Sequence, residues 1–292
     1  MTDRIPANVR LAAYVLTLNE EAQIADAVTS LKQVTDHVVV IDSGSTDCTM
    51  EKAGRAGAEV QVRPFDSFGK QRNFAIDYVV ERFHPEWILT IDADERLSPG
   101  LVIEIRATMV VPDSADAYMV PLAIRFEGRV LRHGGLSRSR LLRLYRPTAG
   151  CYESRSVNEH FALAPGRTLA VLRSPIEHND VWSWERHIAK HNRYSTLEAR
   201  ERAAAVLGRR ESMSAVQAFQ APYLRRRWLR EQVWNRLPAK PLLRFAQMYL
   251  VSGGFLDGAP GFDIALFQAW QELCTERKFR EIISGPVDPE CH

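Results

Sequence analysis

Two aspartates with a single residue between them are the clearest place for chemistry in this sequence. Asp92 and Asp94 directly follow the apolar run WILTI at 87–91. Two carboxylates in alternation at the end of a strand can both reach one hard cation, and such a cation can hold a diphosphate. The same residues are also compatible with a solvated acidic turn. The position of Asp92 and Asp94 in the fold decides which of these two interpretations is favoured.

A second set of polar residues follows an earlier apolar run. Asp42, at a strand end, could accept hydrogen bonds from a base or a ribose, and Gly44 would leave the backbone room for close approach. An ordinary strand-to-helix loop capped by Thr46 or Asp47 explains the same residues. Asn19, after the first apolar run, could likewise belong to a binding loop or simply cap a helix.

Other polar clusters are more ambiguous. Lys70, Arg72 and Asn73 open a predicted helix, where amide donors and cations favour phosphate, although surface charge explains them as well. His187 and His191 are four residues apart on a predicted helix. No glutamate follows His187, so the pattern is not the HExxH zinc arrangement, and we do not expect a metal there.

The elements that must position these residues alternate between strand and helix from residue 10 to about 111. Short, branched apolar runs predict buried parallel strands over 11–18, 37–41, 59–63 and 87–91. Stretches of helical periodicity separate them, the longest over 69–83. This order predicts a doubly wound α/β sheet, whose ligands bind at the carboxyl ends of the strands. The polar loops described above fall at those ends.

The character of the chain changes after residue 112. The segments 116–131 and 140–146 predict longer, partly exposed strands that pair antiparallel, and 184–207 predicts a helix. The segment 222–250 is then basic and aromatic. Its charged residues are Arg225, Arg226, Arg227, Arg230, Arg236, Lys240, Arg244 and a single acid, Glu231. With Tyr223, Trp228 and Trp234 it could meet anionic headgroups at a bilayer surface, or it could be a solvated helix packed on the catalytic domain.

Composition excludes several classes of protein. The chain has 292 residues, 46% hydrophobic and 25% charged, with a net charge of +2, so it is not fibrous, collagen-like or wholly disordered. The near-neutral charge and the lack of a nucleic-acid motif argue against a nucleic-acid partner. Four widely spaced cysteines, at 48, 151, 274 and 291, predict neither a disulfide framework nor a structural zinc site. The start of the sequence lacks a secretory pattern, and no apolar stretch reaches the ~18 residues of a membrane span, so we expect a cytoplasmic protein. The segment 245–270 comes nearest to such a stretch, and the sequence leaves open whether it enters the bilayer or packs against protein.

Taken together, the motifs resemble a known family. In chain order they are TLNEE (17–21), VVVIDSGSTD (38–47), FGKQRNFA (68–75), LTIDADER (89–96), RHGG (132–135), RLYR (143–146), NRYST (192–196) and GFLDG (254–258). This run is similar to family 2 glycosyltransferases of the lipopolysaccharide-core glucosyltransferase type. The resemblance covers roughly residues 10–270. It implies a GT-A fold, a nucleotide-sugar donor and inversion at the anomeric carbon.

The resemblance also implies roles for individual residues. The residues expected around the nucleotide and ribose are Thr17, Asn19, Glu20, Asp42, Gly44, Arg72 and Asn73. The metal-binding residues, for Mg²⁺ or Mn²⁺, would be Asp92, Asp94 and His178. The acceptor loop would be His133, Gly134 and Gly135, and the catalytic base would be Glu159. One departure from the family is Asn158, where relatives commonly have histidine, and it leaves the acceptor contact at that position open.

The sequence therefore predicts an inverting, metal-dependent glycosyltransferase. Residues 1–182 would form the GT-A domain, with a nucleotide-sugar half (1–111) and an acceptor half (112–182), and 183–292 a helical, membrane-associating extension. The enzyme would use a UDP-hexose and extend a lipid-linked glycan on the inner face of the cytoplasmic membrane. One alternative is an enzyme that extends a polyprenyl-diphosphate oligosaccharide, and another is a non-catalytic scaffold at the membrane surface. A nucleotidyltransferase is the third, but the sequence lacks the Gly-rich loop followed by Arg and Lys that such an enzyme would carry after the first strand.

Overall fold

The structure is a computed structural model of the 292-residue chain. It describes residues 10–126, 128–136, 139–153, 160–179, 184–208, 228–230 and 232–285. The chain divides into two compact units. Unit 1 consists of Met1–Leu131 and Leu136–Val181, and unit 2 of Arg132–Gly135 and Trp182–His292.

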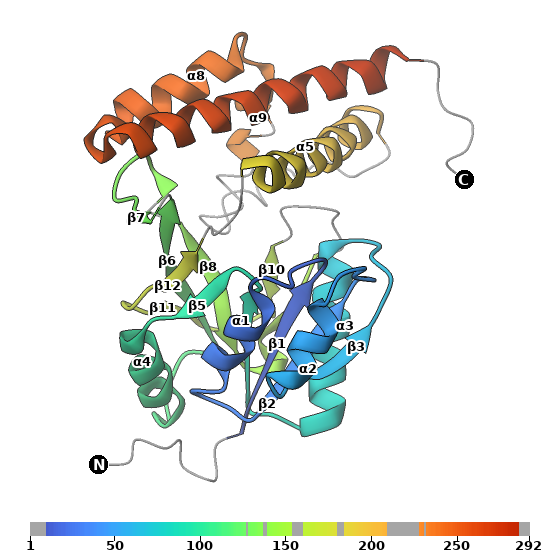
Figure 1. The fold of residues 1–292 in the computed structure, drawn as a ribbon, viewed down its shortest axis with the longest axis vertical. Helices are drawn as coiled ribbons and strands as arrows, with labels where there is room; N and C mark the ends of the chain where they lie inside the picture. The colour runs from blue at the N-terminus through green and yellow to red at the C-terminus, as the bar shows by residue number, and fades with distance from the viewer. Residues whose placement is uncertain are drawn as a thin grey trace. The chain divides into compact units, whose positions relative to one another are not determined.

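Unit 1 alternates strands and helices as expected and then continues in strands (Figure 1). Its helices are α1 (Ile24–Leu31), α2 (Thr49–Arg55), α3 (Phe68–Phe83), α4 (Pro99–Met109) and the 3-10 turn η2 (Pro147–Ala149). Its strands are β1 (Leu11–Thr17), β2 (His37–Asp42), β3 (Glu59–Val62), β4 (Trp87–Asp92), β5 (Glu95–Leu97), β6 (Ala117–Phe126), β7 (Arg129–Val130), β8 (Arg140–Tyr145), β9 (Gly150–Tyr152), β10 (Phe161–Leu163), β11 (Leu169–Val171) and β12 (Ile176–Asn179).

The main sheet runs in the order β3-β2-β1-β4-β8-β6-β12-β5. Strands β3, β2, β1 and β4 are parallel, while β8 is antiparallel to both β4 and β6. In this register Thr17 pairs with Asp42 and Leu16 with Asp92, so the carboxyl ends of β1, β2 and β4 meet at one edge. Ligands bind at this edge in open α/β sheets.

Helices cover both faces of the sheet. Ala13 and Val15 of β1 pack in one apolar cluster with side chains from α1, α2 and α4. Ala12 and Tyr14 point the other way and pack in a second cluster with α3. A central strand that is buried on both faces explains why its sequence is a continuous apolar run. The predicted fold class, a mostly parallel α/β sheet flanked by helices with a helical C-terminal extension, is confirmed.

Local signals fix the ends of α3, the helix that carries two of the predicted donor residues. Ser67 precedes the helix in extended conformation, and its hydroxyl accepts a hydrogen bond from the Lys70 amide. The helix ends at His84, whose φ of 47° is left-handed. These caps set the two ends of the helix that carries Arg72 and Asn73.

Unit 2 is helical, with α9 packed against α5 and α8 (Figure 1). Its described elements are α5 (Trp184–Val206), η3 (Trp234–Arg236), α8 (Lys240–Ala246), η4 (Gln247–Val251), η5 (Gly254–Asp257) and α9 (Ala259–Ser284). Glu276 of α9 accepts hydrogen bonds from Arg202 of α5 at 2.7 Å and from Lys240 of α8. Within the described residues, no helix combines the length and the apolar character needed to cross a bilayer.

Candidate active site

The Asp92 carboxylate lies at the end of β4 between two arginines. Its Oδ1 accepts a hydrogen bond from Arg72 Nη2 at 3.1 Å, and its Oδ2 accepts one from Arg143 Nη2 at 2.6 Å. Both guanidinium groups are nearly buried, whereas the Asp92 side chain is partly exposed. Burial raises the pKa of Asp92, but the charges of Arg143 and Arg72 outweigh it and lower that pKa to about 2. Asp92 is therefore ionised and already charge-paired.

Glu95 and Arg143 form the buried support of this group. Arg143 Nη2 also donates to Glu95 Oε1 at 2.5 Å, and Glu95 Oε2 accepts a hydrogen bond from the Asp92 amide at 2.9 Å. Burial raises the pKa of Glu95, against the lowering effect of Arg143. Sequence reasoning missed both residues. Arg143, between two leucines in the strand RLLRLY, was the available signal, because a cation in such a position needs a buried partner.

Asp94 lies beside His178, with 3.3 Å between Oδ2 and Nε2. The sheet causes this approach, since β12 runs antiparallel to β5 and pairs His178 with Glu95. Asp94 is buried and His178 partly buried. Arg96 fixes the turn by donating to the carbonyls of Ala93 and Glu95.

The side chains at this turn can be compared with what Mg²⁺ or Mn²⁺ requires. A carboxylate and an imidazole are ligands for such ions, and Mg²⁺ commonly takes only one or two carboxylates together with substrate phosphates and water. Asp94 and His178 fit that requirement, while Asp92 is engaged by two arginines. In the part of the chain that is described, no cluster of three or more His, Cys, Asp or Glu side chains forms a complete site. An ion here would depend on oxygen ligands from the substrate or water.

The loops after β1 and β2 are tied to each other. Asn19, with a left-handed φ of 57°, accepts a hydrogen bond from the Thr46 amide through its Oδ1 at 2.8 Å. The backbone amide of Asn19 donates to Ser45 Oγ, and the backbone amide of Glu20 donates to Thr49 Oγ1, both at 2.8 Å. Asn19 therefore joins the two loops and does not cap a helix. This brings together the two segments predicted to border the nucleotide.

Asp42 is fully buried and organises its own loop. Its Oδ1 accepts from the amides of Gly44 and Ser45 at 2.9 and 2.7 Å, and its Oδ2 accepts from Ser45 Oγ at 2.5 Å. Gly44 has a φ of 96°, which favours glycine. Thr17, at the end of β1, is also buried, and its carbonyl accepts from the Ser43 amide. Contact of these residues with a donor stays a prediction.

Asn73 holds the chain that leads to the predicted base. Its side-chain amide donates to the Tyr152 carbonyl and accepts from the Tyr152 amide, both at 2.8 Å. The Glu153 amide donates to the His160 carbonyl at 2.9 Å, closing the β9–β10 hairpin. Glu159 lies outside the described residues, and its catalytic role stays a prediction.

The predicted acceptor loop belongs to unit 2. His133 Nδ1 is 2.9 Å from Asp257 Oδ1, and the His133 amide donates to Asp257 Oδ2 at 2.8 Å. The Gly134 amide donates to the Ser252 carbonyl at 3.0 Å, and Gly134 and Gly135 have φ values of 71° and 86°. Burial raises the pKa of Asp257, but its bonds to His133 lower it overall. Sequence reasoning missed Asp257 as the partner, although it lies in the GFLDG motif.

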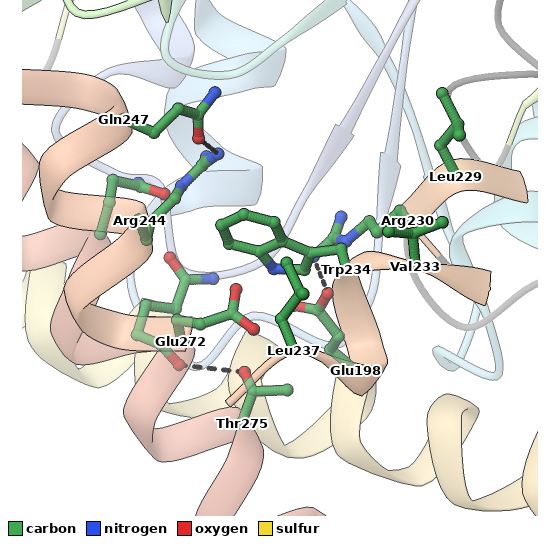
Figure 2. Close-up of a pocket in the computed structure, with 12 residues that line it drawn as sticks. Glu198, Leu229, Arg230, Val233, Trp234, Leu237, Arg244, Gln247, Glu272 and Thr275 are labelled. Atoms are coloured by element: carbon green, nitrogen blue, oxygen red, sulfur yellow. Dashed lines mark hydrogen bonds and ion pairs between the residues drawn. The ribbon is translucent and has the colours of Figure 1, made fainter. Parts of the chain in front are cut away.

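A cavity of about 600 Å³ lies within unit 2 (Figure 2). It is lined by Glu198, Leu229, Arg230, Val233, Trp234, Leu237, Arg244, Gln247, Gln268, Gln271, Glu272 and Thr275. Arg230 and Glu198 form an ion pair across it. None of the predicted site residues lines this cavity. His187 and His191 pack their rings against Phe267, which agrees with a structural role.

Comparison with known proteins establishes the family. Residues 13–173 match the family model described as glycosyl transferase family 2. The chain belongs to this family. The resemblance drawn from the motifs is thereby confirmed.

The chain is similar to individual proteins over different spans. An uncharacterized glycosyltransferase of Rickettsia typhi is 39% identical over 121 residues, which is 41% of this chain and 40% of that protein. The match thus spans about two fifths of the length of that relative. The lipopolysaccharide core biosynthesis glycosyltransferase LpsC of Rhizobium meliloti is 27% identical over 231 residues, covering 77% of this chain and 83% of LpsC. Staphylococcus aureus TarS, in a crystal structure with UDP-GlcNAc, aligns over 94% of this chain and 90% of its own at 14% identity and a TM-score of 0.47.

Proposed function

We propose that this family 2 member transfers a hexose from a UDP-hexose to a lipid-linked glycan, with inversion at the anomeric carbon. The observation that supports this most is the pair Asp94 and His178, 3.3 Å apart beside the carboxyl edge of the parallel sheet. In open α/β sheets that edge binds the ligand. A carboxylate and an imidazole there suit an ion that accompanies a diphosphate.

The proposed reaction is a single displacement. Glu159 accepts the proton of the acceptor hydroxyl as its oxygen attacks the anomeric carbon, and the bond from that carbon to the diphosphate oxygen breaks. The nucleoside diphosphate leaves with the bonding electron pair. Mg²⁺ or Mn²⁺, held by Asp94 and His178, would neutralise the charge that develops on the diphosphate.

The remaining site residues would bind and orient. Arg72 and Arg143 fix the Asp92 carboxylate, which keeps the turn that carries Asp94 in place. The joined loops that carry Asn19 and Asp42, together with Thr17, Glu20, Gly44 and Asn73, would surround the base and ribose. Asn73 would act mainly through Tyr152, since both polar atoms of its amide are bonded to that backbone.

The acceptor is proposed to be a glycolipid of the bacterial envelope. LpsC, named for lipopolysaccharide core biosynthesis, matches most of the chain and supports this choice. The cations in the basic segment suit an anionic membrane surface, which supports a location on the inner face of the cytoplasmic membrane. A polyprenyl-diphosphate oligosaccharide would present the same chemistry to the site and is the alternative acceptor.

The test is release of nucleoside diphosphate from a panel of UDP-hexoses, with Mn²⁺ and a bacterial envelope glycolipid extract. Glu159→Gln should lose ~10²–10⁴-fold in acceptor-dependent release, because the general base is gone, and should keep donor binding. Glu177→Gln is the matched control, since Glu177 lies on β12 in an ion pair with Arg125 and should keep its activity. Full activity in Glu159→Gln would reject the assigned base. No release above background by the wild type with any UDP-hexose would reject the proposed function in favour of a scaffold.

A further inference from the structure

The cavity of about 600 Å³ is lined entirely by residues of unit 2 (Figure 2). Its volume falls within the ~300–1,000 Å³ of small-molecule sites. One wall is a polar stripe on α9. The stripe consists of positions i, i+3, i+4 and i+7 on one face of that helix, which are Gln268, Gln271, Glu272 and Thr275. A helix face that packs on its neighbours is normally apolar, so this stripe indicates a binding wall.

Part of the stripe has polar groups that the protein leaves unused. Gln271 Oε1 is 2.8 Å from His191 Nδ1, and the Thr275 hydroxyl donates to the Gln271 carbonyl at 3.0 Å. The half-buried side chains of Gln268 and Glu272 form no hydrogen bond or ion pair with the described residues. Polar groups withdrawn from water without a partner cost free energy. A ligand that hydrogen-bonds to them would therefore be favoured.

Arg244 adds donors from the α8 side of the cavity. Its Nη1 donates to Gln247 Oε1 at 3.1 Å, which leaves most of its five N–H groups without a partner among the described residues. Burial lowers the pKa of Arg244, and the like charge of Arg230 acts in the same direction. Gln247 begins a π-helical segment, Gln247–Val251. Such segments are rare and are frequent at functional sites, so the local structure supports a binding role for this wall.

Trp234 supplies an apolar surface beside these polar groups. In Figure 2 its indole lies between Arg244 and the Arg230–Glu198 ion pair. The face of an aromatic ring is electron-rich, so it attracts weakly positive C–H groups. The cavity thus combines one aromatic platform with hydrogen-bond donors and acceptors.

The chemistry of the lining identifies the class of ligand. Two arginines and two glutamates balance in charge, so the lining favours neither a strongly anionic nor a strongly cationic ligand. An acyl chain would leave the unused polar groups without partners. A pyranose carries hydroxyl groups that each donate and accept, and it has an apolar face of C–H groups. It therefore matches the amides, the charged groups and the indole together.

We propose that this cavity is a glycan-binding subsite that holds a neutral pyranose unit, with Trp234 against the face of the ring and Glu272 and Arg244 on its hydroxyl groups. The inference deepens the proposed function, because the glycan would be that of the acceptor, and this purpose rests on the proposed function. Its failure is distinguishable, because binding of a sugar without nucleotide reads unit 2, whereas UDP-hexose turnover reads unit 1.

The experiment is saturation-transfer NMR titration of the full chain with the methyl glycosides of glucose, galactose and mannose, without nucleotide or added metal. Methyl glucuronide is the anionic comparison. The wild type should bind at least one neutral glycoside. Trp234→Ala should weaken that binding ~3–10-fold, because the stacking surface is lost. Glu272→Gln, which preserves the shape of the side chain, should weaken it by a similar factor, because the charged acceptor is lost.

Trp184→Ala and Glu281→Gln are the matched controls. Trp184 lies on α5 with 43% of the residue exposed, Glu281 is exposed on α9, and neither lines the cavity. Both controls, and Asp94→Asn in unit 1, should bind the glycoside as the wild type does. The absence of wild-type binding to any neutral glycoside would overturn the proposal, as would wild-type affinity in both cavity variants or an equal loss in the controls. Tighter binding of the glucuronide than of the glucoside would contradict the charge balance and overturn it as well.

Discussion

Replacing Arg143 by methionine tests whether the buried charge network supports the Asp92 turn. The side chain of Arg143 is almost fully buried and holds Asp92 Oδ2 at 2.6 Å and Glu95 Oε1 at 2.5 Å. Without it, Glu95 would be a buried carboxylate that has lost its hydrogen-bonded cation. Breaking a buried pair in this way costs ~3–5 kcal/mol. Asp92 is partly exposed and still bonded to Arg72, so we expect it to contribute little to the loss.

Protonation sets an upper limit on this cost. A carboxyl with an ordinary pKa of 4.5 can be protonated at pH 7 for about 3.4 kcal/mol, so the penalty from Glu95 cannot exceed that amount. Burial already raises the pKa of Glu95, and loss of Arg143 removes the main influence that lowers it. In Arg143→Met the folded state should therefore hold a proton that the unfolded state has released. The free energy of unfolding of the variant should then fall as the pH rises above 4.5. The difference in unfolding free energy between wild type and variant should be smaller at pH 5 than at pH 7, by up to ~2.7 kcal/mol.

The assay is urea denaturation of wild type and Arg143→Met at pH 7 and pH 5, followed by circular dichroism. The double variant Arg143→Met with Glu95→Gln is the control, because a neutral amide removes the stranded charge and should recover much of the loss at pH 7. A loss of unfolding free energy under ~1 kcal/mol at pH 7 would refute the reasoning, because an exposed surface ion pair contributes that much. A double variant no more stable than the single one would refute it independently.

Three other substitutions test separate parts of the structure. Asn73→Ala removes both hydrogen bonds to the Tyr152 backbone and should cost ~1–3 kcal/mol in urea denaturation; a loss below ~0.5 kcal/mol would show that the bridge is not needed. Burial raises the pKa of Glu276, but its bonded cations lower that pKa to about 2, so the free energy of unfolding should fall as the pH drops from 4.5 toward 2. Glu276→Gln should remove this contribution to the pH dependence of stability. The same pH dependence in Glu276→Gln and wild type would contradict the role of Glu276. Gly261→Ala would place a Cβ 2.0 Å from the Gly254 carbonyl oxygen and should cost ~1–3 kcal/mol by calorimetry, whereas an unchanged Tm would contradict the close approach.

The parallel half of the sheet could be predicted from sequence because its signals are local. The apolar run 11–18 is observed as β1 (Leu11–Thr17), and 87–91 as β4 (Trp87–Asp92). Placement of Asp92 at the edge next to Thr17 and Asp42 then follows from the geometry of parallel strands. Local periodicity and strand order were sufficient for these residues.

Local sequence patterns could not predict the partners of the site residues, because these partners are distant in the sequence. Arg143 reaches Asp92 only because β8 pairs with β4. His178 reaches Asp94 because β12 pairs with β5, and only the family resemblance had grouped these two residues. His133 and Asp257 are likewise 124 residues apart. Strand register across an antiparallel edge depends on tertiary packing, which a local pattern does not encode.

The most direct test of a metal-assisted nucleotide-sugar site is thermal unfolding with a panel of nucleoside diphosphates, with and without Mn²⁺, on wild type and Asp94→Asn. A nucleotide at ~100 times its dissociation constant should add about 2.7 kcal/mol to the stability of the native state. For a chain of this size that corresponds to ~2–4 °C for each kcal/mol. We expect a shift of several degrees with UDP that requires Mn²⁺ and is lost in Asp94→Asn. No shift with any nucleotide, or a UDP shift that Asp94→Asn retains in full, would contradict a metal-assisted site at this turn.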